Sequence, residues 1–286
     1  MKIKNLKLKI IFFGSSKYVI PIIEVLRRDF DLALVVTTEK HAADPVPSYC
    51  IKSKVCYYVV TDFRQKNIID KLKEQHPDIA MLASFGAIIS KSVLDIFKYG
   101  ILNIHPSLLP KYRGPTPVQT AILKGDKTTG VTIIKLDEQV DHGPVLLQKK
   151  EAILENDTSE SLYERLFKLS ASSIVRTIEL YIRGEIIPQE QNHLKATFTK
   201  MLTRQDGYFD TNKPPTTQTL DRMIRAYYPW PGAWTELRIK NKELRIKFLP
   251  EKKVQVEGKK PVDIETFKRG YPNSINWTPK LLGQQE

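Results

Sequence analysis

The sequence has few cysteines and no long apolar run. Cys50 and Cys56, its two cysteines, stand six positions apart, which fits neither a CxxC redox pair nor a zinc knuckle. We therefore expect packing roles for both thiols and a reducing compartment. The apolar run at residues 10–13 ends at Gly14, too short for a signal peptide or a membrane span. These absences predict a cytosolic protein with no membrane partner.

Acidic side chains are also scarce relative to basic ones. The 286 residues include 32 Asp or Glu against 45 Lys or Arg, a formal net charge of +13. An excess of this size favours a polyanionic partner, most commonly nucleic acid, although a surface charged for solubility is the alternative interpretation. The hydrophobic fraction of 41% is typical of a globular protein with one large or two modest domains.

The first two hundred residues alternate between short apolar runs and segments of helical periodicity. This alternation predicts an α/β fold with a doubly wound, mostly parallel, Rossmann-like sheet. Ligands of such sheets bind at the carboxyl ends of the strands. The expected strands are residues 9–13, 32–36, 55–60, 79–82, 101–104 and 130–136, and the expected helices lie at 18–28, around 68–72 and at 116–124.

Polar groups with chemical potential follow two of these strands. Asn103 and His105 lie at the end of one strand, where alternation places both on the same face. Three prolines and a glycine make residues 106–115 a stiff loop. A second loop, residues 137–144, contains Asp141, 36 positions after His105.

These three residue types can work together in transfer to an amine. A histidine exchanges a proton near neutral pH, and a neighbouring carboxylate favours its charged form. An asparagine N–H suits an oxyanion that develops on a carbonyl carbon. The residue types alone leave two other interpretations, a purely structural His105 and a zinc site formed by His105, Asp141 and His142.

The spacing of the motifs is more specific than the residue types. The segment from Asn103 to Gly114 (NIHPSLLPKYRG), followed by Gly125-Asp126, by residues 129–132 (TGVT) and by residues 141–144 (DHGP), resembles the signature of the folate-dependent formyltransferases. The resemblance implies that Asn103, His105 and Asp141 are catalytic, with no metal. It also implies that 10-formyltetrahydrofolate is the co-substrate, held by Phe85, Ile88, Ser107, Leu108, Leu109 and Pro110.

Three further segments resemble the family members that formylate methionyl-initiator tRNA. They are residues 13–21 (FGSSKYVIP), 204–210 (RQDGYFD) and 224–234 (IRAYYPWPGAW). The resemblance implies a catalytic domain at residues 1–203 and a small β-rich, barrel-like domain at 204–286 that binds tRNA. It implies initiator methionyl-tRNA as the partner and a monomeric enzyme of translation initiation.

A repeated pentapeptide in the second domain predicts a basic hairpin. The sequence ELRIK occurs at residues 236–240 and 243–247, and Asn241-Lys242 is the expected two-residue turn. Residues 238–260 contain nine Lys or Arg against three Glu. Strand alternation places four of these basic side chains on one face of the hairpin, where they are suited to bind RNA phosphates. The alternative is that this face is only exposed to solvent and binds nothing. The four basic residues are Arg238, Lys240, Arg245 and Lys247.

Other functions share parts of these signals. A sugar-nucleotide N-formyltransferase using the same folate is the main alternative, because loop 38–47 is shorter and less basic than in the tRNA-formylating members and the second domain is small. A hydrolase that releases formate also stays open, whereas the intact Asn103, His105 and Asp141 argue against a catalytically silent RNA-binding module. A nucleotide-dependent dehydrogenase is disfavoured, because no GxGxxG follows the first strand.

Overall fold

The structure, a computed structural model, describes residues 8–60, 66–239 and 242–271. Its contacts divide the chain into two compact units. The first consists of Met1–Pro115, Thr129–Glu151 and Tyr163–Phe198, and the second of Thr116–Thr128, Ala152–Leu162 and Thr199–Glu286. The boundary expected after residue 203 falls just inside the last segment of the second unit and stays a prediction.

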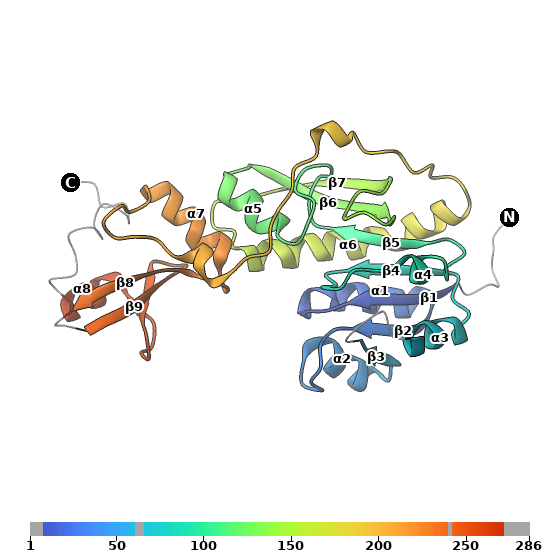
Figure 1. The fold of residues 1–286 in the computed structure, drawn as a ribbon, viewed down its shortest axis with the longest axis horizontal. Helices are drawn as coiled ribbons and strands as arrows, with labels where there is room; N and C mark the ends of the chain where they lie inside the picture. Colours follow the sequence, from blue (N-terminus) through green and yellow to red (C-terminus); the bar gives the residue numbers. More distant parts are fainter. Residues whose placement is uncertain (1–7, 61–65, 240–241, 272–286) are drawn as a thin grey trace. The chain divides into compact units, whose positions relative to one another are not determined.

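A seven-stranded sheet forms the centre of the first unit (Figure 1). Its order is β3-β2-β1-β4-β5-β6-β7, and β1 to β5 pair in parallel, whereas β6 runs antiparallel to β5. The predicted mostly parallel, doubly wound sheet is confirmed. The strands are β1 (Lys9–Gly14), β2 (Asp31–Thr37), β3 (Tyr57–Val59), β4 (Ile79–Ala83), β5 (Ile101–His105), β6 (Thr128–Lys135) and β7 (Val145–Ala152).

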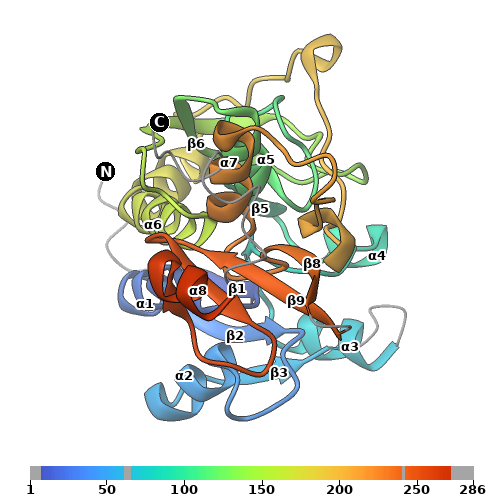
Figure 2. The same ribbon diagram turned by 90° about the vertical axis from the view of Figure 1, so that its left-hand side faces the viewer.

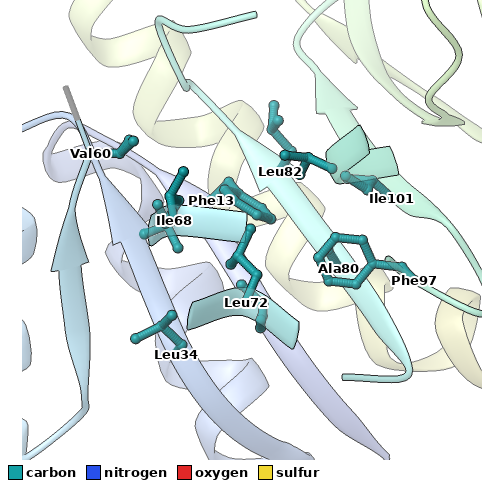
Figure 3. Packing of buried hydrophobic residues seen from close by; sticks show 12 residues of the cluster. Phe13, Leu34, Val60, Ile68, Leu72, Ala80, Leu82, Phe97 and Ile101 are labelled. Atoms are coloured by element: carbon teal, nitrogen blue, oxygen red, sulfur yellow. The ribbon is translucent and has the colours of Figure 1, made fainter. Parts of the chain in front are cut away.

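The helices of this unit bury both faces of the sheet. Alternate residues of β1 point to opposite faces, and residues 10–14 are all buried, as expected for a sheet covered on both sides. On one face, Phe13 packs against residues of α3 and α4 in an apolar cluster (Figure 3). The helices are η1 (Lys17–Val19), α1 (Ile20–Asp29), α2 (Pro45–Ser53), α3 (Lys66–Glu74), α4 (Lys91–Leu94), η2 (His193–Lys195) and most of α6 (Ser159–Ile182).

The sequence predicted a loop at residues 38–47, but the last part of this segment is helical. Helix α2 begins at Pro45. Proline suits a first helical turn, because its fixed φ is helical and the N–H groups of that turn have no partner within the helix. The backbone N–H of Val46 donates to the Glu39 carboxylate over 2.8 Å. Residues 45–47, which the sequence analysis counted as part of this loop, therefore belong to a helix.

The second unit combines helices with a small antiparallel sheet. Its four strands follow the order β11-β10-β9-β8 and confirm the predicted β-rich C-terminal region. Helix α8 packs on this sheet through Ile264 and Phe267 (Figure 2). The elements are α5 (Pro117–Lys124), η3 (Arg204–Gly207), α7 (Thr217–Tyr227), β8 (Ala233–Ile239), β9 (Lys242–Leu249), β10 (Lys253–Val256), β11 (Val262–Asp263) and α8 (Ile264–Gly270).

Strands β8 and β9 form the predicted hairpin with a different register. Ile239 pairs with Lys242, so Lys242 lies in the strand and not in the turn. The two connecting residues are 240–241, which lie outside the described residues. The buried pairs Ala233–Phe248 and Thr235–Ile246 set this register, because a shift would break their packing.

Along the described segments, no helix combines the length and the apolar character needed to cross a membrane.

A carboxylate near the start of the second unit's last segment stabilises the fold in a pH-dependent way. The Asp206 carboxylate accepts from the Lys200 ammonium, from the backbone N–H of Thr203 over 2.7 Å and from the Thr203 hydroxyl over 2.8 Å. These donors, the lysine first, lower the pKa of Asp206 from 3.8 to about 2. The ionised Asp206 carboxylate is therefore more stable in the folded chain than in the unfolded chain.

We predict that Asp206→Asn destabilises the second unit at pH 7 and has a diminishing effect in acid. A depressed pKa contributes stability above the unfolded value of 3.8, and this contribution disappears as the pH falls toward about 2. Trp230 and Trp234 belong to this unit and the described part of the first unit has no tryptophan, so urea unfolding followed by tryptophan fluorescence reports on the second unit. The exposed Asp221, changed to Asn, is the control. A gap between wild type and Asp206→Asn that is constant from pH 7 to pH 3 would contradict the assignment.

Candidate functional site

Strand β5 delivers two polar side chains to its carboxyl end. Asn103 and His105 are 6% and 4% exposed, and Ile101, on the same face two residues earlier, belongs to the apolar core cluster. The alternation of the strand therefore carries one face from the core into the site. Burial of two polar groups requires hydrogen-bond partners, and the partners come from the loops that follow.

Asp141 supplies an acceptor for several of these groups. Its Oδ1 accepts from Asn103 Nδ2 over 3.1 Å, and its Oδ2 accepts from the backbone N–H of Gly114 over 2.7 Å. The residue is 9% exposed and has a positive φ of 49°, a conformation that aspartate tolerates better than most residues. The structure thus brings Asn103 and Asp141 together from positions 38 residues apart in sequence.

His105 lies between two acceptors. Its Nδ1 is 3.4 Å from Asp141 Oδ1, and its Nε2 is 2.8 Å from the carbonyl oxygen of Tyr112. A neutral imidazole has one N–H and can donate to only one of them, whereas the charged ring can donate to both. The geometry therefore holds the imidazole between a buried carboxylate and a backbone carbonyl.

The loop after β5 is held in place by a buried threonine. The Thr132 hydroxyl donates to the Ser107 carbonyl over 2.6 Å and accepts from the backbone N–H of Leu109 over 3.1 Å. Gln148 Nε2 donates to the Leu109 carbonyl over 2.7 Å and lies 3.1 Å from the threonine oxygen. The loop expected to hold folate is thus anchored from β6 and β7. Sequence reasoning quoted Thr132 in a motif without a role and missed Gln148.

The other residues expected at the folate site occupy different environments. Phe85 packs edge-on against Phe13, with ring centroids 5.6 Å apart. Ile88 is 83% exposed, which leaves an apolar surface open to a ligand. Leu109 is buried, and Leu108 and Pro110 are half-buried. Their folate-binding role stays a prediction.

His142 turns away from the predicted catalytic residues. Its Nδ1 lies 2.6 Å from Asp137 Oδ2, and its ring stacks on His193 at 4.0 Å between centroids. A zinc site with His105 and Asp141 is therefore not formed. Among the residues that the structure describes, no group of three or more His, Cys, Asp or Glu could hold a metal ion.

The basic residues of the hairpin take part in local contacts. Arg245 lies 4.9 Å from the centre of the Trp234 ring, and its Nη1 donates to Glu257 over 3.0 Å. The Lys247 ammonium donates to the Pro229 carbonyl over 3.0 Å, and burial, with a contribution from Arg204, lowers its pKa. The Arg238 side chain and the whole of Lys240 lie outside the described residues. A role in tRNA binding stays a prediction for all four.

Comparison with known proteins identifies the family. Residues 8–178 match the model of the formyl transferase family, which is more than half of the chain. This chain belongs to the formyltransferase family. The match covers β5, β6 and both loops of the site, so Asn103, His105 and Asp141 lie within the family's shared region.

The formyltransferase relatives include curated proteins and solved structures. The methionyl-tRNA formyltransferase of Roseiflexus sp. (strain RS-1) is 39% identical over 241 residues, which are 81% of this chain and 74% of the relative. A sugar N-formyltransferase from Shewanella sp. has a TM-score of 0.68 at 19% identity, over 86% of this chain and 99% of that one. HypX from Aquifex aeolicus, in complex with tetrahydrofolic acid, has a TM-score of 0.60 at 20% identity, over 85% of this chain and 38% of HypX.

Proposed function

We propose that this chain transfers the formyl group of 10-formyltetrahydrofolate to the amino group of methionine on initiator tRNA. The observation that carries the proposal is the buried Asn103–His105–Asp141 cluster in a chain 39% identical to a methionyl-tRNA formyltransferase. The sugar N-formyltransferase shares the fold at 19% identity, which supports the fold alone. Sequence similarity therefore favours the tRNA acceptor.

The residues at the site fit a folate that carries a formyl group. Exposed Ile88 offers apolar surface, and loop 107–110, which closely follows His105 in the chain, is anchored through the backbone of Leu109. 10-Formyltetrahydrofolate supplies the activated formyl group when it is bound. Ser107, Leu108, Leu109, Pro110, Phe85 and Ile88 would hold it.

Asn103 would stabilise the negative charge that develops on the formyl oxygen as the amine attacks. Its amide carries two N–H donors, of which one is directed to Asp141 over 3.1 Å. A second donor held in this orientation is available to an oxyanion, and such a donor contributes about 3–4 kcal/mol of transition-state stabilisation. Because Asp141 orients the amide in advance, little reorganisation accompanies the reaction.

His105 and Asp141 would act as a charged pair. If the ring takes up a proton during the reaction, Asp141 would face it directly, since Nδ1 and Oδ1 are 3.4 Å apart. The other ring nitrogen donates to the Tyr112 carbonyl, and exchange of this acceptor for the formyl oxygen would supply a charged donor. Asp141 would also accept, directly or through water, the proton that the amine loses.

As part of this proposal, we expect the protein to be cytosolic and monomeric, as the sequence analysis predicted. Initiator methionyl-tRNA is the acceptor that we expect the second unit to bind.

Transfer of labelled formyl from 10-formyltetrahydrofolate to methionyl-initiator tRNA tests the function directly. We expect robust transfer to charged tRNA and none to uncharged tRNA, because the methionine amine is the nucleophile. Amino-sugar nucleotides and water serve as competing acceptors, the latter measured as released formate. Transfer to an amino-sugar nucleotide without transfer to tRNA would replace the proposal with the alternative.

His105→Ala and Asp141→Ala are each expected to lower kcat about 100-fold or more, since each removes part of the electrostatic support for the transition state. Single-turnover transfer measures the effect. His76→Asn is the control, because His76 is exposed at the end of α3 and asparagine tolerates its positive φ of 47°. Turnover within threefold of wild type in either catalytic variant would exclude the assigned role.

Neutralising Arg238, Lys240, Arg245 and Lys247 together is expected to weaken tRNA binding and to reduce its salt dependence. Each lost phosphate contact lowers the slope of log affinity against log salt by about one. The matched control neutralises four exposed lysines of the first unit, Lys52, Lys54, Lys73 and Lys98, for the same change in net charge. An unchanged slope in the hairpin variant, measured by filter binding, would assign these residues to a solvated face.

A further inference from the structure

One short segment of the first unit holds both loops of the site. We call residues 189–197 the strap. At one end of the strap, Gln189 and Val145 form two backbone hydrogen bonds with each other, of 2.7 and 2.9 Å. At the other end, the Thr197 carbonyl accepts from the backbone N–H of Arg113 over 2.8 Å. The strap therefore joins the segment after the Asp141 loop to the loop that follows β5.

Between these ends, Gln191 reaches the backbone of the Asp141 loop. Its Nε2 donates to the carbonyl of Asp141 over 2.9 Å and to the carbonyl of Gly143 over 2.8 Å. Its Oε1 accepts from Arg113 through Nη2 over 2.7 Å and through Nε over 3.2 Å. All the hydrogen-bonding capacity of one buried amide is directed to the two catalytic loops.

The orientation of this amide follows from its neighbours. A guanidinium can only donate and a backbone carbonyl can only accept, so the oxygen must face Arg113 and the nitrogen must face the two carbonyls. Gln191 is 7% exposed and Arg113 is 3% exposed. Burial lowers the pKa of Arg113, and the nearby Asp141 and Asp137 oppose that shift. The contact is built into the interior and is not a chance surface pairing.

The backbone of the Asp141 loop is restricted by its own conformation and close packing as well as by Gln191. Asp141 has a φ of 49°, and a Cβ placed on Gly143 would lie 1.8 Å from the Lys135 carbonyl oxygen. One carbonyl bound by Gln191 belongs to Asp141 itself, and the other belongs to Gly143, two residues later in the same loop. A change in their position moves the Asp141 carboxylate relative to Asn103 Nδ2 and His105 Nδ1, which lie 3.1 and 3.4 Å away.

We propose that Gln191 is a positioning residue for formyl transfer, anchored by Arg113 and acting through the backbone of Asp141. It orients the carboxylate that in turn orients Asn103 and His105. The inference rests on the proposed function for its kinetic part, and on the geometry of the site for its spectroscopic part.

Two substitutions separate positioning from simple support of Arg113. Gln191→Leu removes the donors and the acceptor. Gln191→Glu keeps an acceptor for Arg113 but has no N–H for the carbonyls of Asp141 and Gly143 when ionised. Gln189→Leu is the matched control, because this side chain is exposed in the same strap and its contact with Val145 is through the backbone.

Steady-state transfer with saturating substrates is the first measurement. We expect kcat to fall about 30-fold or more in both Gln191 variants, with KM for each substrate within about threefold of wild type, because small misplacements of catalytic groups affect the transition state most. Gln189→Leu should match wild type. Circular dichroism and folate binding establish that each variant is folded.

The ring-carbon NMR signals of His105, assigned by comparison with His105→Asn at one pH, provide a second measurement that needs no turnover. They should shift in both Gln191 variants and stay unchanged in Gln189→Leu. Wild-type kcat in Gln191→Glu, with unshifted His105 signals, would overturn the inference while leaving the proposed function intact. Absence of transfer in wild type would instead refute the proposed function, and the His105 signals would still test the positioning role.

Discussion

The structure of the site depends on the buried carboxylate of Asp141. A charge in the protein interior is tolerated only when donors surround it, because its lost hydration must be replaced. Here the donors come from the Asn103 amide, the His105 ring and the backbone of Gly114, so a strand and two loops converge on one side chain. The need to surround one carboxylate with donors thus brings three separate segments together. The same convergence places an amide donor and an imidazole next to one carboxylate.

The sheet explains why these segments can meet. β5 ends at His105, and the antiparallel strand β6 pairs Thr132 directly with it. The carboxyl end of β5 and the start of β6 therefore share one edge, and the Thr132 hydroxyl can bind the loop that leaves β5. The Asp141 loop follows β6, whose last residue, Lys135, pairs with Leu102 near the start of β5, so this loop has to return along β5 to reach Asn103 and His105. The strap then crosses both loops and completes their support.

Catalysis and choice of acceptor draw on different parts of the chain. The fold is shared with a sugar N-formyltransferase, whose name indicates a different acceptor from that of the methionyl-tRNA formyltransferases, so the fold alone does not select the acceptor. We expect selection to come from surfaces outside the buried cluster. In the second unit, Lys247 already donates to the Pro229 carbonyl, and Arg245 lies over Trp234. Each would have to combine these local contacts with binding to phosphate, which limits the geometry in which tRNA can approach this face.

The sequence by itself determined the first six strands of the large sheet and helices α1, α3 and α5, because a buried parallel strand is a short apolar run and a helix that packs on a sheet has apolar residues at a period of 3.6. It also determined Asn103 and His105 as a pair, since strand alternation is local, and the family through the motifs around them. Only the tertiary structure decided the partners of those residues. Gln191 lies in a segment without periodicity and binds the backbone 50 residues away, so no local pattern marks it. The hairpin register and the internal contact of Lys247 were likewise decided by packing, because they depend on which groups become neighbours when the chain is folded.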